Sequence, residues 1–343
     1  GLQGSPCGRD LLLSTALKEA AARTLGSSIN QMMLSRVANN LFWMDRYMER
    51  SYGLLNLIKT TYNATLDSGD YSDWSRILTT YLGKTPEIEF RNHQDTISTI
   101  LYIIFDDTNS NSVLNMITKA RENARSVQEH ISRELWLSVN KYYLHLSQDN
   151  ISAKYKKEDP ISIVNELLQY NHIYYSVADI SQERGNAYCF MNLGKYLERV
   201  VQSMDFLDVR IINLDQNNEN LYESYFFKNL LISIGGYQLY LKTFKSIFSI
   251  ENIIEMIAIN EKFPRSIIYS VNKLNIHTQR LNNFNQINDK KLIFLLGKLS
   301  STLKYTTIES IKIKGLENFL KEINVDLNKI SISIDETYFY QKY

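Results

Sequence analysis

Two short segments of the sequence place arginine and glutamate inside strongly apolar helical patterns. The first, "LFWMDRYMER", contains Arg46, Glu49 and Arg50, and the second, "FMNLGKYLER", repeats Tyr, Glu and Arg in register. Clustered arginines bind carboxylates or phosphates through paired N–H donors, and a glutamate with a shifted pKa moves protons. These residue types therefore suit anion binding or acid–base chemistry.

A third group of charges lies in "ARENARSVQEHISRELW". Helical spacing puts Arg121 and Arg125 on one face and makes Glu122 a partner for Arg125. On one continuous helix Glu134 falls on the apolar side, so it is expected to need an arginine from another helix, because burying an unpaired carboxylate is costly. Arg265, in "FPRS", is expected at a helix start, where anions also bind.

Two interpretations of these charges remain open at the level of the sequence. In the first, buried Arg–Glu pairs only fix the register of a large bundle. In the second, several helices direct the arginines into one cleft that binds an acidic peptide or a phosphate, and the glutamates orient them or carry protons. The candidate catalytic residues are Glu49, Glu122, Glu134 and Glu198, and the candidate anion-binding residues are Arg46, Arg50, Arg121, Arg125, Lys195, Arg199 and Arg265.

Other common chemistries have no signal in the sequence. The phosphate-binding loops G-x-x-x-x-G-K-[ST] and G-x-G-x-x-G and the hydrolase motif G-x-S-x-G are absent. None of the five histidines has a glutamate three positions earlier, so a di-iron site is not expected. Cys189 is interpreted as a small core residue. We therefore expect no metal and no cofactor.

Composition narrows the class of protein further. The net charge of +1 gives no basic field for nucleic acid. No run of 18 apolar residues occurs, so no membrane span is expected. Two cysteines do not make a disulfide framework, which fits a reducing cytoplasm. The opening stretch, "GLQGSPCGRDLLLSTALKEAAARTLGS", contains no Asn, Ile or Tyr, so residues 1–31 are expected to be a non-native or disordered leader and residues 32–343 a single domain.

The pattern of that domain is helix after helix. Apolar residues recur at the helical period between breaker-rich connections such as "DDTNSNS", where Ser112 is the expected N-cap. Pro160 and Pro264 lie at expected helix starts. The last segment, "ISISIDETYFYQKY", alternates and is expected to be a short strand or a frayed tail. The fold class predicted is an all-α multi-helix bundle.

The helix around the first segment is expected to be buried on two sides. It is apolar both on the side of Met48 and on the opposite side of Tyr47, and Arg46, Glu49 and Arg50 share the remaining sector. Arg46 and Glu49, three residues apart, can pair along this helix. The apolar flanks of the second segment match those of the first, which indicates an internal pseudo-two-fold duplication.

These motifs resemble the bacterial Alpha-E domain family, a domain of unknown function. The matching stretches are "MLSRVANNLFWMDRYMER", "LLNLI", "ARENARSVQEHISRELW", "LGKYLERVVQSMDFLDVR" and "FPRSI", in the family's order. Lys195 stands where the family usually has arginine. The resemblance implies an all-helical protein encoded beside, or fused to, circularly permuted ATP-grasp and transglutaminase-like proteins, which are therefore the expected partners.

The function that follows is an accessory or peptide-handling component of an ATP-grasp-linked peptide synthesis or modification system. Its Arg- and Glu-lined cleft would bind an anion. One alternative is an enzyme in its own right with a glutamate as general base, and another is a non-catalytic helical scaffold with buried Arg–Glu pairs. No catalytic residue is carried over from the family.

Overall fold

The structure is a computed structural model, and it describes most of the chain. The described residues are 8–69, 74, 93–148, 151, 159–211, 221–245, 248–285 and 290–339. Side chains of the first helix are described from Ser35 onward. The expectation that residues 1–31 are a leader therefore stays a prediction.

Helices account for all regular secondary structure of the described residues, which confirms the all-α fold. The first half of the chain forms α1 (Gly8–Ser68), α3 (His93–Phe105), α4 (Val113–Ser126), the single 3₁₀ turn η1 (Gln128–His130), α5 (Arg133–Leu146) and α7 (Pro160–Ser181). The second half forms α8 (Asn186–Ile211), α9 (Leu221–Ser233), α10 (Tyr237–Phe244), α11 (Ile250–Ala258), α12 (Ile267–Asn285), α13 (Lys290–Lys304), α14 (Ile308–Lys314), α15 (Leu316–Ile334) and the π-helix η2 (Asp335–Phe339).

Short polar side chains define where several helices begin. The Oγ atom of Ser112 accepts a hydrogen bond from the backbone N–H of Asn115 at 3.2 Å, as the N-cap prediction requires. Ser132 caps α5 in the same way through Leu135. Pro160 is the first residue of α7, where its missing N–H costs nothing.

The expectation of a strand or a frayed tail at the end of the chain is wrong for the described residues. α15 runs to Ile334 and continues as the π-helix η2. Ile330, Ile334 and Tyr338 lie four residues apart and are all buried. This spacing places the three side chains on one helical face against the core, so packing overrides the local alternation of the sequence.

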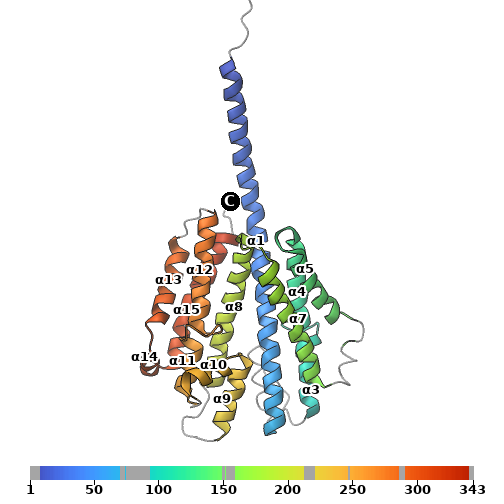
Figure 1. The fold of residues 1–343 in the computed structure, drawn as a ribbon, viewed down its shortest axis with the longest axis vertical. Coiled ribbons are helices and arrows are strands. Elements are labelled where there is room, and N and C mark those ends of the chain that lie inside the picture. The colour runs from blue at the N-terminus through green and yellow to red at the C-terminus, as the bar shows by residue number, and fades with distance from the viewer. Residues whose placement is uncertain are drawn as a thin grey trace, which may run out of the picture.

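Two long helices form the centre of the bundle. Figure 1 shows α1 and α8 side by side, and both helices run downward in that view. The two helices pack directly on each other. On one side α4 and α7 pack against α1, and α5 covers both. On the other side α12 packs against α8, α13 packs against α12, and α15 packs against α13 and also contacts α8.

The two halves repeat the same arrangement of helices. In the first half the central helix α1 packs on α4, α4 packs on α5, and α5 packs on α7. In the second half the central helix α8 packs on α12, α12 packs on α13, and α13 packs on α15. The turns that precede α4 and α12 also match. Ser112 donates its N–H to the carbonyl of Asn109 at 2.9 Å, and Ser266 donates to Phe263 at 2.9 Å. The arrangement supports the predicted pseudo-two-fold duplication.

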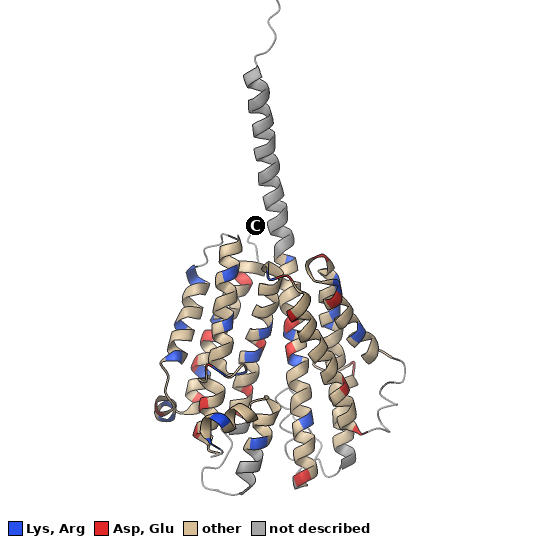
Figure 2. Cartoon of the chain, in the orientation of Figure 1, with Lys and Arg blue, Asp and Glu red and all other residues tan. Residues whose placement is uncertain are grey.

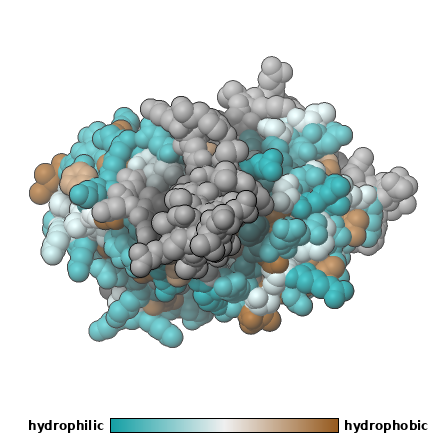
Figure 3. All heavy atoms as spheres, turned by 90° about the horizontal axis from the view of Figure 1, so that it is seen from above, coloured by the Kyte–Doolittle hydropathy of each residue, from teal (hydrophilic) through white to brown (hydrophobic). Residues whose placement is uncertain are grey.

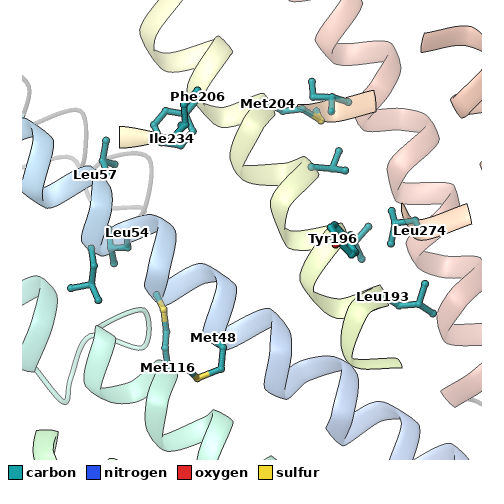
Figure 4. Packing of buried hydrophobic residues seen from close by; sticks show 14 of the residues in the cluster. Met48, Leu54, Leu57, Met116, Leu193, Tyr196, Met204, Phe206, Ile234 and Leu274 are labelled. Atoms are coloured by element: carbon teal, nitrogen blue, oxygen red, sulfur yellow. The ribbon is translucent and has the colours of Figure 1, made fainter. Parts of the chain in front are cut away.

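The core fills the spaces between the central helices and their neighbours. In Figure 4, Met48 of α1 meets Met116 of α4, and Leu193 points from α8 toward Leu274 of α12. α1 and α8 lie very close together at Gly194, where an added Cβ atom would overlap the backbone carbonyl of Phe42. Only glycine permits this close contact between the two backbones.

Charges of both signs are spread along the described helices, and the described part of the face seen from above is mostly hydrophilic (Figure 2 and Figure 3). Figure 2 shows Lys and Arg interspersed with Asp and Glu along the helices, and Figure 3 shows scattered apolar spots around the end of the molecule seen from above. Among the described residues, no helix combines the length and the hydrophobicity that a transmembrane span requires.

Candidate functional site

The two Glu-Arg dipeptides of the central helices pair crosswise. Arg199 of α8 donates from Nε and Nη2 to the two carboxylate oxygens of Glu49 on α1, both at 2.9 Å. Arg50 of α1 donates from Nε and Nη2 to the carboxylate of Glu198 on α8, at 2.6 and 2.9 Å. Each arginine therefore makes a bidentate pair with the other helix, the strongest geometry for this type of ion pair.

Two further arginines complete the arrangement. Arg46 bonds Glu198 through Nε at 3.0 Å and Nη2 at 2.9 Å, and Arg265 reaches Glu49 with Nη2 at 3.0 Å. Pairing of Arg46 with Glu49 along α1 was expected from their spacing, but Arg46 instead crosses to α8. We call the whole group the crossed cluster: Arg46, Glu49, Arg50, Glu198, Arg199 and Arg265.

Arg265 reaches the cluster because the turn before α12 is docked on α8. The hydroxyl of Ser203 donates to the carbonyl of Arg265 at 2.7 Å, and Nη1 of Arg199 donates to the carbonyl of Pro264 at 3.2 Å. The helix itself begins at Ile267, capped by Ser266. The matching turn before α4 has Asn111 in place of Arg265, so the cluster is not symmetric.

Both carboxylates of the crossed cluster are out of contact with water. Glu49 is 0% exposed and Glu198 is 3% exposed. Burial alone would raise the pKa of Glu49, but the charges of Arg199 and Arg265 and the hydrogen bonds from Arg199 and Tyr175 lower it to about 2. Glu49 is consequently ionised throughout the physiological range.

A second set of buried polar groups lies next to the cluster on the side of α7. The hydroxyl of Tyr175 donates to Glu49 at 2.7 Å, and the hydroxyl of Tyr174 donates to Asp45. Burial raises the pKa of Asp45 to about 7, although Lys195 and the bond from Tyr174 act in the opposite direction. Asp45 can therefore exchange a proton near neutral pH.

Lys195 occupies the position that corresponds to Arg46, but its environment differs. Its ammonium group lies over the rings of Tyr196 and Tyr175, 5.0 and 5.9 Å from their centroids. Burial lowers its pKa, and the nearby Asp45 partly offsets this effect. Sequence reasoning missed Asp45 and the two tyrosines of α7. An aspartate between Met44 and Arg46 on a buried helix was the available signal.

The charges of the third segment do not join the crossed cluster. Arg121 pairs with Glu122 at 2.6 Å and with Asn140 at 3.0 Å, and the predicted Glu122–Arg125 pair is present at 3.9 Å. Arg125 is mostly exposed, with 63% of its side chain in contact with solvent. These residues form a surface group over α4 and α5.

The expectation that Glu134 faces the core is wrong, because Glu134 is exposed. The expected helix is interrupted after Ser126 by the turn η1, and Ser132 starts a new helix. Helical phase is lost across such a break, so the periodicity before it does not determine the direction of Glu134. Glu134 lies in the first turn of α5, where a negative charge is favourable.

The described residues offer little for metal or thiol chemistry. Within them, no group of three or more His, Cys, Asp or Glu side chains could hold a metal ion. Cys189 is fully buried in α8, and burial raises the pKa of its thiol to about 11. It therefore packs as a small core residue, as the sequence indicated.

Comparison with known proteins identifies the family. No curated protein and no solved structure matches the chain. A family model does match, over residues 33–339, and its description is "A predicted alpha-helical domain with a conserved ER motif". The sequence contains this dipeptide at 49–50, 183–184 and 198–199. The first and last of these form the crossed pairs, and the match spans nearly the whole chain, so this protein belongs to the Alpha-E family.

Proposed function

We propose that this Alpha-E protein is an accessory, peptide-handling component of an ATP-grasp-linked peptide synthesis or modification system. In this proposal the crossed cluster offers positive charge to an acidic peptide or a phosphate. Circularly permuted ATP-grasp and transglutaminase-like proteins are the proposed partners, and the motif resemblance supports them. The charge balance of the crossed cluster supports the ligand.

The observation that carries the proposal is an excess of guanidinium groups. Four arginines share the two carboxylates of Glu49 and Glu198. None of the four is sealed from water: the exposed fractions of the side chains of Arg46, Arg50, Arg199 and Arg265 are 14%, 27%, 12% and 14%. In this proposal an anion approaches from the exposed side and binds donors that the two glutamates do not use.

Nearby aspartates neutralise only part of this excess at neutral pH. Burial raises the pKa of Asp45 to about 7, and burial together with Glu198 and Asp208 raises the pKa of Asp205 to about 7. Both carboxyl groups are then only partly ionised at pH 7. The cluster keeps a net positive charge, which favours a negatively charged ligand over a neutral one.

The same geometry argues against a glutamate as general base. A base must accept a proton near the working pH, but the pKa of Glu49 is about 2 and both its oxygens are occupied by arginine. Glu198 is enclosed by Arg46 and Arg50 in the same way. The accessory role fits these buried ion pairs better than a catalytic one.

Calorimetric titration with acidic and neutral peptides of equal length tests the ligand. The acidic peptide should bind more tightly, and Arg50→Lys should weaken it by about tenfold or more, because lysine keeps the charge but loses the bidentate fork. Arg125→Lys, on the exposed face of α4, is the matched control and should leave binding unchanged. The ligand assignment would be refuted if the acidic and neutral peptides bound equally tightly, or if Arg50→Lys bound the acidic peptide as tightly as Arg125→Lys does.

The system-level role needs a separate experiment. The protein is purified from its native host with its associated proteins, and mass spectrometry identifies both the proteins and any bound peptides. Recovery of an ATP-grasp protein, and amide formation by that protein that increases when this chain is added, would support the accessory role. ATP-dependent amide formation by this chain alone would contradict it.

A non-catalytic scaffold is the second candidate, and one observation favours it. The carboxylates of Glu49 and Glu198 are saturated by hydrogen bonds from the opposite helix, so the cluster connects the two halves of the molecule. A scaffold of this kind would bind no peptide. The titration with Arg50→Lys separates the two candidates.

A further inference from the structure

A second positively charged site lies between α8 and α12, outside the crossed cluster. A cavity of about 520 Å³ opens there, a size in the range of small-molecule sites. Eight residues line it: Arg184, Tyr188, Tyr196, Lys273, Ile276, His277, Arg280 and Phe284. Three of these side chains are cationic, four carry aromatic rings and none is acidic.

Much of the positive charge of this cavity is not neutralised by the protein. Arg184 pairs with Asp179 at 2.8 Å and lies 4.2 Å from the centroid of Tyr188. In the part of the chain that the structure describes, neither Lys273 nor Arg280 has an acidic partner within ion-pair distance. Two cations that converge on a cavity without a counter-charge are available to an anionic group of a ligand.

Four aromatic side chains line the cavity. His277 stacks on Tyr196 with an interplanar angle of 17° and a centroid separation of 6.0 Å, and it meets Tyr188 edge to face at 5.7 Å. Phe284 stands at the rim with 53% of its surface exposed. Rings arranged in this way can accept a further planar group by stacking or edge contact.

His277 supplies an independent sign that the cavity is incomplete without a ligand. It is only 5% exposed, and its Nδ1 atom is buried without a hydrogen-bond partner among the described residues. Burial and the charges of Arg280, Lys195 and Lys273 lower its pKa to about 3, so the ring is neutral at pH 7. A buried polar atom without a partner is costly, and a ligand oxygen or N–H in the cavity would relieve that cost.

We propose that the cavity between α8 and α12 binds a small ligand that carries a carboxylate or phosphate group close to a planar ring. Lys273 and Arg280 hold the anionic group, and the ring lies against Tyr188 and Tyr196. His277 contributes a hydrogen bond to the polar part of the ligand. This site goes beyond the proposed function and uses no residue of the crossed cluster, so either can fail without the other.

Calorimetric titration of the full chain with five probes tests the proposal. Phenyl phosphate and N-acetylphenylalanine combine a ring with an anion, inorganic phosphate and acetate lack the ring, and N-acetylphenylalanine amide lacks the charge. At least one of the two aromatic anions should bind about tenfold more tightly, or better, than every ringless or neutral probe. The ringless probes lose the aromatic contact, and the neutral probe loses the charged hydrogen bond. The tighter of the two aromatic anions identifies a carboxylate or a phosphate monoester as the natural group.

Variants then assign the binding to this cavity. Lys273→Gln and Arg280→Gln change side chains at the surface of α12 and should each weaken the preferred probe by about tenfold or more, with folding unchanged. Arg125 is an exposed cation on α4, in the first half of the chain, and Arg125→Gln should leave binding unchanged. The proposal is overturned if ringless anions bind as well as aromatic ones, if both α12 variants retain full affinity, or if no probe binds at millimolar concentration.

Discussion

At the scale of single residues, the crossed cluster shows how adjacent charges in sequence serve different partners. Sequence adjacency suggests that Arg199 balances Glu198, but the structure pairs Arg199 with Glu49 and Arg50 with Glu198. Neighbouring residues on a helix point about 100° apart, so a Glu-Arg dipeptide cannot close on itself in a bidentate way. It can instead meet the same dipeptide on a parallel neighbour.

This pairing predicts a specific pattern of stability. Arg199→Met leaves the buried carboxylate of Glu49 with Arg265 as its remaining cation, so the free energy of unfolding should fall by roughly 3 kcal/mol or more. Adding Glu49→Gln should recover much of that loss, whereas adding Glu198→Gln should not, because Glu198 belongs to the other pair. Urea denaturation of the single and double variants measures this. Equal recovery from either glutamine would contradict the crossed pairing.

Asp45 predicts a dependence of stability on pH. Its pKa rises from 3.8 in the unfolded chain to about 7 in the folded protein, so between these values the folded state binds more protons and stability falls as pH rises. In Asp45→Asn this decline should be smaller between pH 4.5 and 7. Glu49 acts outside this window, since its lowered pKa costs stability only as pH falls below about 4.5.

Comparison of the unchanged protein with the Asp45→Asn variant separates the contribution of Asp45 to the pH dependence of stability from that of other titrating groups. Asp205, with a pKa also raised to about 7, contributes a decline in both proteins, and His277, with a pKa lowered to about 3, contributes a rise in both. Thermal melts at intervals of half a pH unit give the difference. Parallel curves for the two proteins would show that Asp45 does not titrate as described.

At the scale of helices, the close contact of α1 with α8 decides where the cluster forms. Gly194 lets the backbones approach, and Gly53 accommodates the side chain of Gln202, whose amide donates to the carbonyl of Glu49 at 3.1 Å. These contacts lie on either side of the crossed pairs. The helices are therefore held at a separation that guanidinium and carboxylate groups can bridge.

Gly194→Ala should separate α1 from α8. The new methyl group would overlap the carbonyl of Phe42, so the free energy of unfolding should fall by about 1–3 kcal/mol or more. Gly297→Ala is the matched control, because a Cβ atom there meets nothing within 4 Å in the interior of α13. That variant should gain about 0.5–1 kcal/mol from helix propensity alone. A neutral or stabilising effect at Gly194 would contradict the close approach.

At the scale of the whole molecule, the two halves share the core between α1 and α8 and should unfold together. The sequence has three tryptophans, Trp43, Trp74 and Trp136, and all of them lie in the first half. Tryptophan fluorescence therefore follows the first half, while far-UV circular dichroism follows the helices of both. The two urea transitions should coincide. Separate midpoints would show that the halves unfold independently and that the crossed cluster does not couple them.

The sequence by itself determined the elements of this protein and the residues that matter most. The helical period predicted the all-α fold, Ser112 was recognised as an N-cap, and the apolar flanks of the two Glu-Arg segments indicated the paired helices. These features depend on contacts within one or two turns of a helix, which a local pattern records. Glu134 and the last segment show the limit of predictions from local sequence. The turn η1 changes the direction of Glu134, and packing against the core makes the last segment helical.

Only the tertiary structure decided which charges meet. The partner of Glu49 lies 150 residues away on α8, and Arg265 arrives from a turn still further along the chain. The cavity between α8 and α12 likewise brings Arg184 together with Arg280 and His277, which no short motif contains. Ion pairing and cavity shape depend on distances of a few ångströms between helices. Tertiary packing sets those distances, through glycine and core side chains between α1 and α8 for the crossed cluster and through the contact of α8 with α12 for the cavity.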